Sequence, residues 1–336
     1  MSKPWNFVSW LAVAGLAWGA GYLYNARYGG ELSWLRIMYE RKIAIAAEKN
    51  QAPRRLLITG GSGAHYTINS QLIEQGLGIP VVNLGLDGPV GLDVIFPSII
   101  GQVRQGDIVL LIPEYLILWS EDGLGDRSGQ FGVATGRPGL GNVPPQRLAQ
   151  DILMLGNPTL KAITKSTLDL IEKGKLTGYY SDPVNEFGDP TYTKPRTGKW
   201  WQLPINDPAS PHAIKRIEQF RKEVEAKGGT LVLSLPWVYA RTDEKSVSNV
   251  KKTRDELAKI APLIYEKDTL NMKTDSNLFA DTHYHLKPEA RAIRAREIVE
   301  QLKQVPELKP LFASQQKTSK PTNQPPKPNP KVQPPK

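Results

Sequence analysis

The stretch RRLLITGGSGAHYTINSQLIEQGLGIPVVNLG, residues 54–85, opens with the short apolar run Leu56–Ile58, which predicts a buried parallel strand. A glycine-rich turn around Ser62 follows, then apolar residues at helical spacing and a second apolar run at 81–85. Strand, turn, helix and strand form one βαβ unit, with a serine hydroxyl at the carboxyl end of its first strand. Ligands of open α/β sheets gather at that edge, so we treat Ser62 as a candidate nucleophile.

Other interpretations of the glycine-rich turn fit the sequence less well. A phosphate-binding loop requires Lys-Ser or Lys-Thr after the glycines, and a dinucleotide fingerprint requires a third glycine; both are missing. The nucleophile elbow of α/β-hydrolases has the pattern Gly-x-Ser-x-Gly, but Ala64 stands in the last position. Ordinary loop composition is the remaining alternative.

Composition excludes several classes of function. The 336 residues contain no cysteine, which rules out disulfides, thiolate metal sites and cysteine nucleophiles. Half of the formal net charge of +10 comes from the lysines of a proline-rich tail, namely Lys317, Lys320, Lys327, Lys331 and Lys336. We therefore expect no nucleic-acid partner, and no cofactor is expected either.

The N-terminus predicts a membrane anchor over residues 1–27. The segment from Trp5 to Tyr24 is uncharged and about as long as a membrane span, and no clean signal-peptide cleavage site follows it. Lys3 precedes this segment, whereas Arg27, Arg36, Arg41 and Lys42 follow it, a distribution that favours a cytoplasmic domain. Residues 28–53 predict an amphipathic helix, either packed on the domain or forming a stalk.

The region 54–313 predicts one α/β domain. Apolar strands at 56–58, 81–85, 108–112, 230–235 and 262–265 alternate with helices, which indicates a five-stranded parallel sheet. A long insertion at about 120–211 holds a helical piece over 146–173 and an aromatic loop with Trp200 and Trp201. These two side chains either stack on a sugar ring or attach the loop to the core. The Pro/Lys-rich residues 314–336 predict a disordered tail.

Ser62 needs a base, and the chain has four histidines, His65, His212, His283 and His285. The last two lie with Asp281 in DTHYH, just before the final helix. An acid and a histidine late in the chain, with a serine after the first strand, resemble the SGNH (GDSL-like) hydrolases. Gly60-Gly61-Ser62 matches their Gly-Asp-Ser block, Gly85 matches their second block, and Asp281 to His285 approximates Asp-x-x-His.

This resemblance implies a flavodoxin-like three-layer sandwich and a set of roles. Ser62 is the expected nucleophile, His285 the base, Asp281 its orienting acid, and His283 the reserve base. His285 is preferred because the small Ala290 follows it by five positions as the last helix begins. The amides of Ser62, Gly63 and Gly85 are the expected oxyanion donors.

The third block departs from the family pattern. SGNH enzymes have Gly-x-Asn after the third strand, and this chain has Pro113-Glu114-Tyr115. We assign Glu114 and Tyr115, together with Trp200 and Trp201, to substrate binding.

The overall layout resembles membrane-anchored envelope members of that superfamily, such as the D-alanine-transfer protein of teichoic acid synthesis and alginate-type O-acetyltransferases. The resemblance implies a serine acyltransferase or esterase that modifies a cell-surface glycan through an acyl-serine intermediate, beside a membrane-bound O-acyltransferase. It also implies a single-pass protein with its domain on the extracytoplasmic (periplasmic) side, against the flanking charges. Two alternatives stay open: a catalytically degenerate scaffold that binds glycan or the acyltransferase, and a metal site at Asp281, His283 and His285.

Overall fold

The computed structural model describes residues 4–137, 143–176 and 184–316. Its centre is a five-stranded parallel sheet in the order β2-β1-β3-β4-β6, which confirms the predicted α/β class and strand count. This strand order is that of flavodoxin-like folds. The strands are β1 (Leu56–Gly60), β2 (Val81–Asn83), β3 (Ile108–Ile112), β4 (Thr230–Ser234) and β6 (Leu263–Ile264).

A second, two-stranded parallel sheet pairs β5 (Val238–Tyr239) with β7 (Met272–Lys273). The sequence analysis did not predict this sheet, because strands of two residues leave no apolar pattern to detect. Along the chain, β5 lies between β4 and β6, and β7 follows β6 and precedes the loop that carries Asp281 and His285.

One face of the main sheet is covered by α4 (Ser70–Leu77) and α12 (Pro288–Gln304). Their apolar residues pack on strand side chains of that face, Leu56 and Ile58 from β1 and Leu110 from β3. The chain continues into α13 (Lys309–Gln316). The predicted tail therefore begins at least three residues too early, and its remainder, 317–336, lies outside the described residues.

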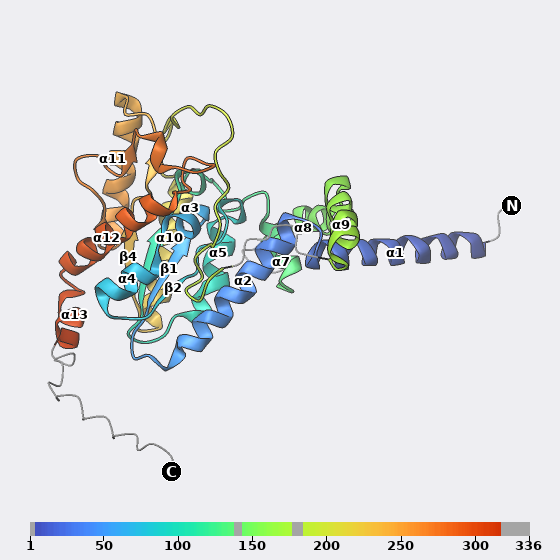
Figure 1. The fold of residues 1–336 in the computed structure, drawn as a ribbon, viewed down its shortest axis with the longest axis horizontal. Helices are drawn as coiled ribbons and strands as arrows, with labels where there is room; N and C mark the ends of the chain where they lie inside the picture. Colours follow the sequence, from blue (N-terminus) through green and yellow to red (C-terminus); the bar gives the residue numbers. More distant parts are fainter. Residues whose placement is uncertain (1–3, 138–142, 177–183, 317–336) are drawn as a thin grey trace, which may run out of the picture.

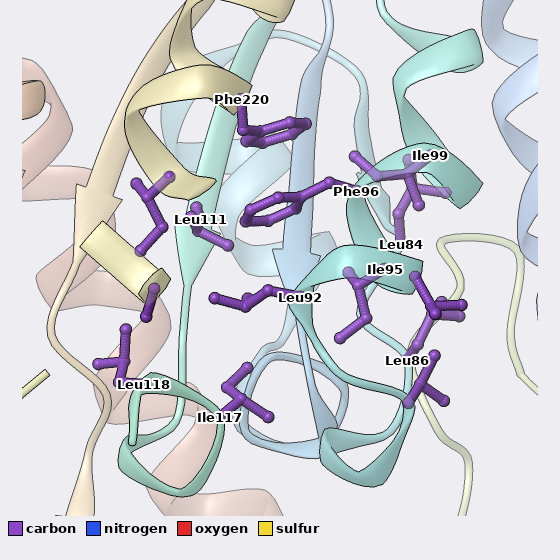
Figure 2. Packing of buried hydrophobic residues seen from close by; sticks show 14 of the residues in the cluster. Leu84, Leu86, Leu92, Ile95, Phe96, Ile99, Leu111, Ile117, Leu118 and Phe220 are labelled. Carbon is purple, nitrogen blue, oxygen red and sulfur yellow. The ribbon is translucent and has the colours of Figure 1, made fainter. Parts of the chain in front are cut away.

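The opposite face is covered by α2 (Glu31–Glu48), α5 (Leu92–Ile99), α10 (Pro211–Ala226) and α11 (Glu244–Ile260). In Figure 2, Phe96 of α5 and Phe220 of α10 lie together against the sheet near Leu111. The two rings are stacked with centroids 4.0 Å apart. Helices on both faces give the three layers that a buried parallel sheet requires.

Shorter elements connect these layers. They are α3 (Ser62–Thr67), α6 (Tyr115–Leu118) and the 3-10 turns Lys49–Gln51, Gly88–Val90, Ile100–Gln102 and Ser276–Leu278. The insertion contains α7 (Ser128–Ala134), α8 (Pro145–Leu155) and α9 (Leu160–Lys173). The helical piece predicted over 146–173 is thus two helices, because Gly156 ends the first and Thr159 caps the start of the second.

Helix α1 (Pro4–Arg27) projects from one end of the molecule (Figure 1). Its segment Phe7–Arg27 is long and apolar enough to cross a membrane, and only 6% of its most apolar window is buried. Such exposure separates α1 from the core helices of the domain. Residues 1–3 of the predicted anchor lie outside the described residues.

Helix α2 packs on the domain, which decides between the two interpretations of residues 28–53. Leu35, Met38 and Ile45 are buried in the core shared with α5 and α10. Figure 1 shows α2 lying along the side of the sheet domain after the chain leaves α1. The helix is therefore part of the fold and not a free stalk.

A pair of substitutions on α2 tests this packing. Leu35→Ala removes a fully buried side chain, so the free energy of unfolding should fall by about 2–5 kcal/mol. Ile37→Ala, on the same helix at 44% exposure, should change it by about 0.5 kcal/mol or less. Urea unfolding of the full chain in detergent micelles measures both values. Equal effects of the two substitutions would contradict the packed arrangement.

Candidate functional site

Ser62 lies where the sequence analysis expects it, at the carboxyl end of β1. The strand ends at Gly60 and α3 begins at Ser62, so the hydroxyl sits in the first turn of a short helix. Ser62 is 9% exposed. The side chain therefore faces the protein interior at the sheet edge.

Glu114 binds the Ser62 hydroxyl. Gly60 of β1 pairs with Ile112 of β3, so Ser62 and Glu114 each stand two residues beyond the paired strand ends. The Ser62 Oγ donates to Glu114 Oε1 at 2.7 Å, and the Gly63 amide donates to the same oxygen at 2.6 Å. The Gly63 amide, a predicted oxyanion donor, is therefore already hydrogen-bonded to Glu114.

Glycines make room for this carboxyl. A Cβ on Gly61, Gly63 or Gly88 would collide with the Glu114 side chain. Glu114 is fully buried against Ser62, and its role in substrate binding stays a prediction. The cause of this burial is the close approach that these glycines allow, which brings the side chain inward against Ser62.

Burial raises the pKa of the Glu114 carboxyl above its usual range, against the opposing effects of the Ser62 hydroxyl and the nearby His285. Burial and then the Glu114 charge raise the pKa of Asp87 to about 7, and the Arg127 guanidinium binds its carboxyl group. Glu114 forms no salt bridge within the described residues. Burial without a salt-bridge partner favours the neutral form of Glu114.

The loop before α12 brings a histidine–carboxylate pair to the same edge. The His285 Nδ1 donates to Asp281 Oδ1 at 2.8 Å, which leaves Nε2 as the acceptor of the neutral ring. That Nε2 atom is buried and has no hydrogen-bond partner in the described part of the chain. An unpartnered acceptor on an oriented imidazole is the arrangement that a general base needs.

Tyr66 joins this pair to the serine helix. Its ring lies 4.1 Å from the ring of His285 between centroids, and its carbonyl accepts the Leu286 amide at 3.3 Å. Because Tyr66 belongs to α3, the helix that starts at Ser62, the structure brings the serine turn and the His285 loop into contact.

His283 points elsewhere. Its Nε2 contacts the carbonyl oxygen of Trp201 at 2.8 Å, and its ring lies 5.5 Å from that of Trp200. The two tryptophans thus surround the reserve base. Among the described residues no group of three or more acidic or histidine side chains fits a metal ion, so the alternative of a metal at Asp281, His283 and His285 finds no support.

Two other predicted site residues have different surroundings. Tyr115, the first residue of α6, is fully buried in the core, and its role in substrate binding stays a prediction. The Gly85 amide, a predicted oxyanion donor, donates to Asn83 Oδ1 at 2.9 Å. Its carbonyl is also occupied, by Lys42.

Lys42 is a functional feature that sequence reasoning missed. The side chain is fully buried, and its Nζ donates to the Gly85 carbonyl at 2.6 Å and contacts His65 Nδ1 at 2.9 Å. Asn83, which also accepts from Lys42, donates in turn to Asp189 Oδ1 at 2.9 Å. The only sequence signal is a polar residue at a position of α2 where the helical pattern faces the core.

A cavity of 420 Å³ lies away from Ser62, between the start of α2 and the insertion. It is lined in part by Asn25, Leu32, Arg127 and Lys161. The carboxyl of Glu114 fills the space next to Ser62 instead.

Comparisons with known proteins add little. No family model matches the chain, and no curated protein matches it. The solved structure of protein YxiM from Bacillus subtilis is similar at 12% identity and a TM-score of 0.33, over 75% of this chain and 56% of that one. A likeness this slight supports no argument about fold or function.

The buried His65 makes stability depend on pH. Burial, and then the Lys42 charge, hold the pKa of His65 well below 6.5, so the unfolded chain binds a proton that the folded protein rejects. Stability should therefore fall as the pH drops below 6.5, by up to about 1.4 kcal/mol per pH unit from this group.

Urea unfolding of the wild type and His65→Gln over a pH series checks this expectation. The slope below pH 6.5 should be flatter in the variant. At pH above about 8 histidine is neutral in both states, so the two curves should run parallel there. Parallel curves over the whole range would contradict the assignment of a neutral, buried His65.

Proposed function

We propose that this protein is a membrane-anchored SGNH-type serine acyltransferase or esterase that acts on cell-envelope polysaccharide on the extracytoplasmic side of the membrane. The observation that carries the proposal is the contact between the Ser62 helix and the Asp281–His285 pair through Tyr66. Nucleophile, base and orienting acid are the parts that acyl transfer requires.

The chemistry follows from these groups. The Ser62 proton passes to His285 Nε2 as Oγ bonds to the acyl carbonyl carbon. Asp281 stabilises the imidazolium, and collapse of the tetrahedral intermediate returns the proton to the departing alkoxide of the donor. The resulting acyl-serine reacts with a glycan hydroxyl, giving transfer, or with water, giving hydrolysis.

Glu114 takes the place of the family's oxyanion asparagine. An ionised carboxylate would repel a developing oxyanion, whereas a protonated carboxyl has an O–H to donate. The burial of Glu114, with no salt-bridge partner among the described residues, favours the protonated form. We therefore propose that neutral Glu114 donates the hydrogen bond that the asparagine side-chain amide donates in SGNH enzymes.

The substrate and partner belong to the same proposal. Trp201 is 67% exposed beside His283, and its indole face suits a sugar ring of the acceptor glycan. The acyl donor is proposed to come from a membrane-bound O-acyltransferase, because α1 is long and apolar enough to keep the domain at the membrane.

A second candidate is a degenerate scaffold that binds glycan or the acyltransferase without forming an acyl-enzyme. The observation that favours it is the occupation of Ser62 Oγ and the Gly63 amide by Glu114. The two candidates differ in whether Ser62 reacts with an electrophile.

Substitutions of the proposed triad separate these candidates. The full chain should be labelled by a fluorophosphonate probe and should hydrolyse p-nitrophenyl acetate, and Ser62→Ala should abolish labelling. His285→Ala should lower turnover by about 10⁴-fold or more. The matched variant His283→Ala should keep most activity, because His283 faces Trp201.

Thermal melting shows whether each variant is folded. A folded wild type that is never labelled supports the scaffold instead. Loss of activity in His283→Ala with retention in His285→Ala would overturn the assignment of the base.

The role of Glu114 has its own prediction. Activity should decline as pH rises through the raised pKa of Glu114, because the oxyanion donor is then ionised. Glu114→Gln carries an amide donor at every pH, so this decline should disappear. Glu114→Ala has no donor and should lose about 10²- to 10³-fold in turnover.

The measurement is p-nitrophenyl acetate turnover against pH for the three proteins. Identical pH profiles for the wild type and Glu114→Gln would contradict a protonated donor. A Gln variant as impaired as the Ala variant would also contradict it.

A further inference from the structure

Helix α9 has its polarity reversed relative to an ordinary surface helix. Its outward side is apolar, with Leu160 at 79% exposure and Ile171 at 76%. Its inward side carries Ala162, Ser166 and Asp169, all buried. A helix on a water-facing surface buries its apolar stripe and exposes its polar one, so the outer face of α9 is built for an apolar environment.

The same apolar surface continues around the helix and onto its neighbour. Further large apolar side chains with half or nearly half of their area exposed are Ile163, Leu168 and Leu170 of α9 and Leu153 and Met154 of α8. This set, together with Leu160 and Ile171, is the hairpin face.

Polar contacts hold the inward side of α9 against the anchor helix. The Tyr24 hydroxyl donates to the Ala162 carbonyl at 2.8 Å and lies 2.7 Å from Ser166 Oγ. The Asn25 amide donates to the Leu155 carbonyl at 2.8 Å. The hairpin of α8 and α9 is thus fastened to α1 by its polar groups, and its apolar groups are left outside.

The fit between the hairpin and α1 is close. A Cβ on Gly156, at the end of α8, would collide with the Trp18 ring. The Trp18 Nε1 donates to the Leu153 carbonyl at 3.3 Å. The contact with α1 therefore extends from Trp18 to Asn25, about 10 Å along a helix axis.

Those residues belong to the apolar segment Phe7–Arg27. Figure 1 shows α8 and α9 beside the base of α1, with α9 running crosswise to it. If α1 spans a bilayer, the hairpin face lies within about 10 Å of the boundary of the hydrocarbon on the side of the domain, the depth at which interfacial helices lie. A crosswise helix at that depth runs along the membrane plane.

We propose that the hairpin of α8 and α9 is a second membrane contact, embedded by the hairpin face in the lipid leaflet nearest the domain. The inference rests on the membrane anchoring within the proposed function and not on its chemistry. Lipid is the occupant because the hairpin face continues the exposed apolar surface of α1 and is flanked by the exposed side chains of Lys161 and Lys175, which suit anionic head groups.

Two attachments have a consequence that one helix alone lacks. A single helix lets a domain swing about its last turn, whereas a hairpin lying beside it fixes the tilt and height of the domain. The Ser62 edge is then held at a set distance from the membrane surface.

Single-cysteine reporters test the proposal, because the natural chain has no cysteine. Leu160→Cys and Ile171→Cys report on α9, and Leu16→Cys, at 75% exposure on α1, is the reference for the anchor. Lys252→Cys, exposed on α11 at the far end of the molecule from α1, is the water-facing control (Figure 1). Each full-length variant is labelled with a polarity-sensitive fluorophore and reconstituted in vesicles of phosphatidylcholine and phosphatidylglycerol.

The emission of the α9 labels should shift to the blue, and lipids that carry a quencher on the upper acyl chain should remove most of it. The emission of the Leu16 label should also shift to the blue, and lipids that carry a deeper quencher should remove most of it. The control should respond only to aqueous iodide. Quenching of Leu16 without quenching of α9 would overturn the second contact and leave the anchor intact. Quenching of neither would overturn both, and disulfide pairing between α9 cysteines of two copies would assign the face to self-association instead.

Discussion

The ammonium of Lys42 is completely buried, and three acceptors enclose it: the Gly85 carbonyl at 2.6 Å, Asn83 Oδ1 at 3.3 Å and His65 Nδ1 at 2.9 Å. A buried ammonium without such partners would lower the free energy of unfolding by roughly several kcal/mol. The helix that carries Lys42 therefore has little freedom of position. The acceptors come from the end of β2 and from α3. Helix α2 therefore sits where one side chain reaches the strand end and the serine helix together.

The same contact joins the helix that follows α1 to the candidate site. Burial and then the Lys42 charge hold the pKa of His65 low, so the ring stays neutral and its Nδ1 is an acceptor. Tyr66 lies between two histidines, with ring centroids 4.4 Å from His65 and 4.1 Å from His285. A continuous set of contacts thus runs from α2, which follows α1, to the expected base.

The sequence predicts a residue's role in this arrangement only where the residues adjacent to it in the chain determine that role. The apolar runs Leu56–Ile58 and Ile108–Ile112 each predict a buried strand, and parallel strands then bring Ser62 and the later loops to one edge of the sheet. The burial of Glu114 against Ser62 was not predicted, because a carboxylate is almost never fully buried and the glycines that make room for it lie in other segments. Lys42 was counted as a charge that flanks the membrane span, because no residue adjacent to it in the sequence indicates which acceptors its ammonium binds.

Glu114 restricts what can reach Ser62. In the unliganded protein its Oε1 satisfies the Ser62 hydroxyl and the Gly63 amide, which spares two buried donors an unmet hydrogen bond. In the proposed reaction the Ser62 proton passes to His285 and the oxyanion accepts from the Gly63 amide, so Glu114 has to release both groups before an acyl carbonyl can react. Because α2 and its buried lysine hold the serine helix close to α1, the proposed function requires a membrane-bound donor to deliver the acyl group at the height of the sheet edge. In that proposal, the exchange of hydrogen bonds at Ser62 precedes any contact to the acceptor.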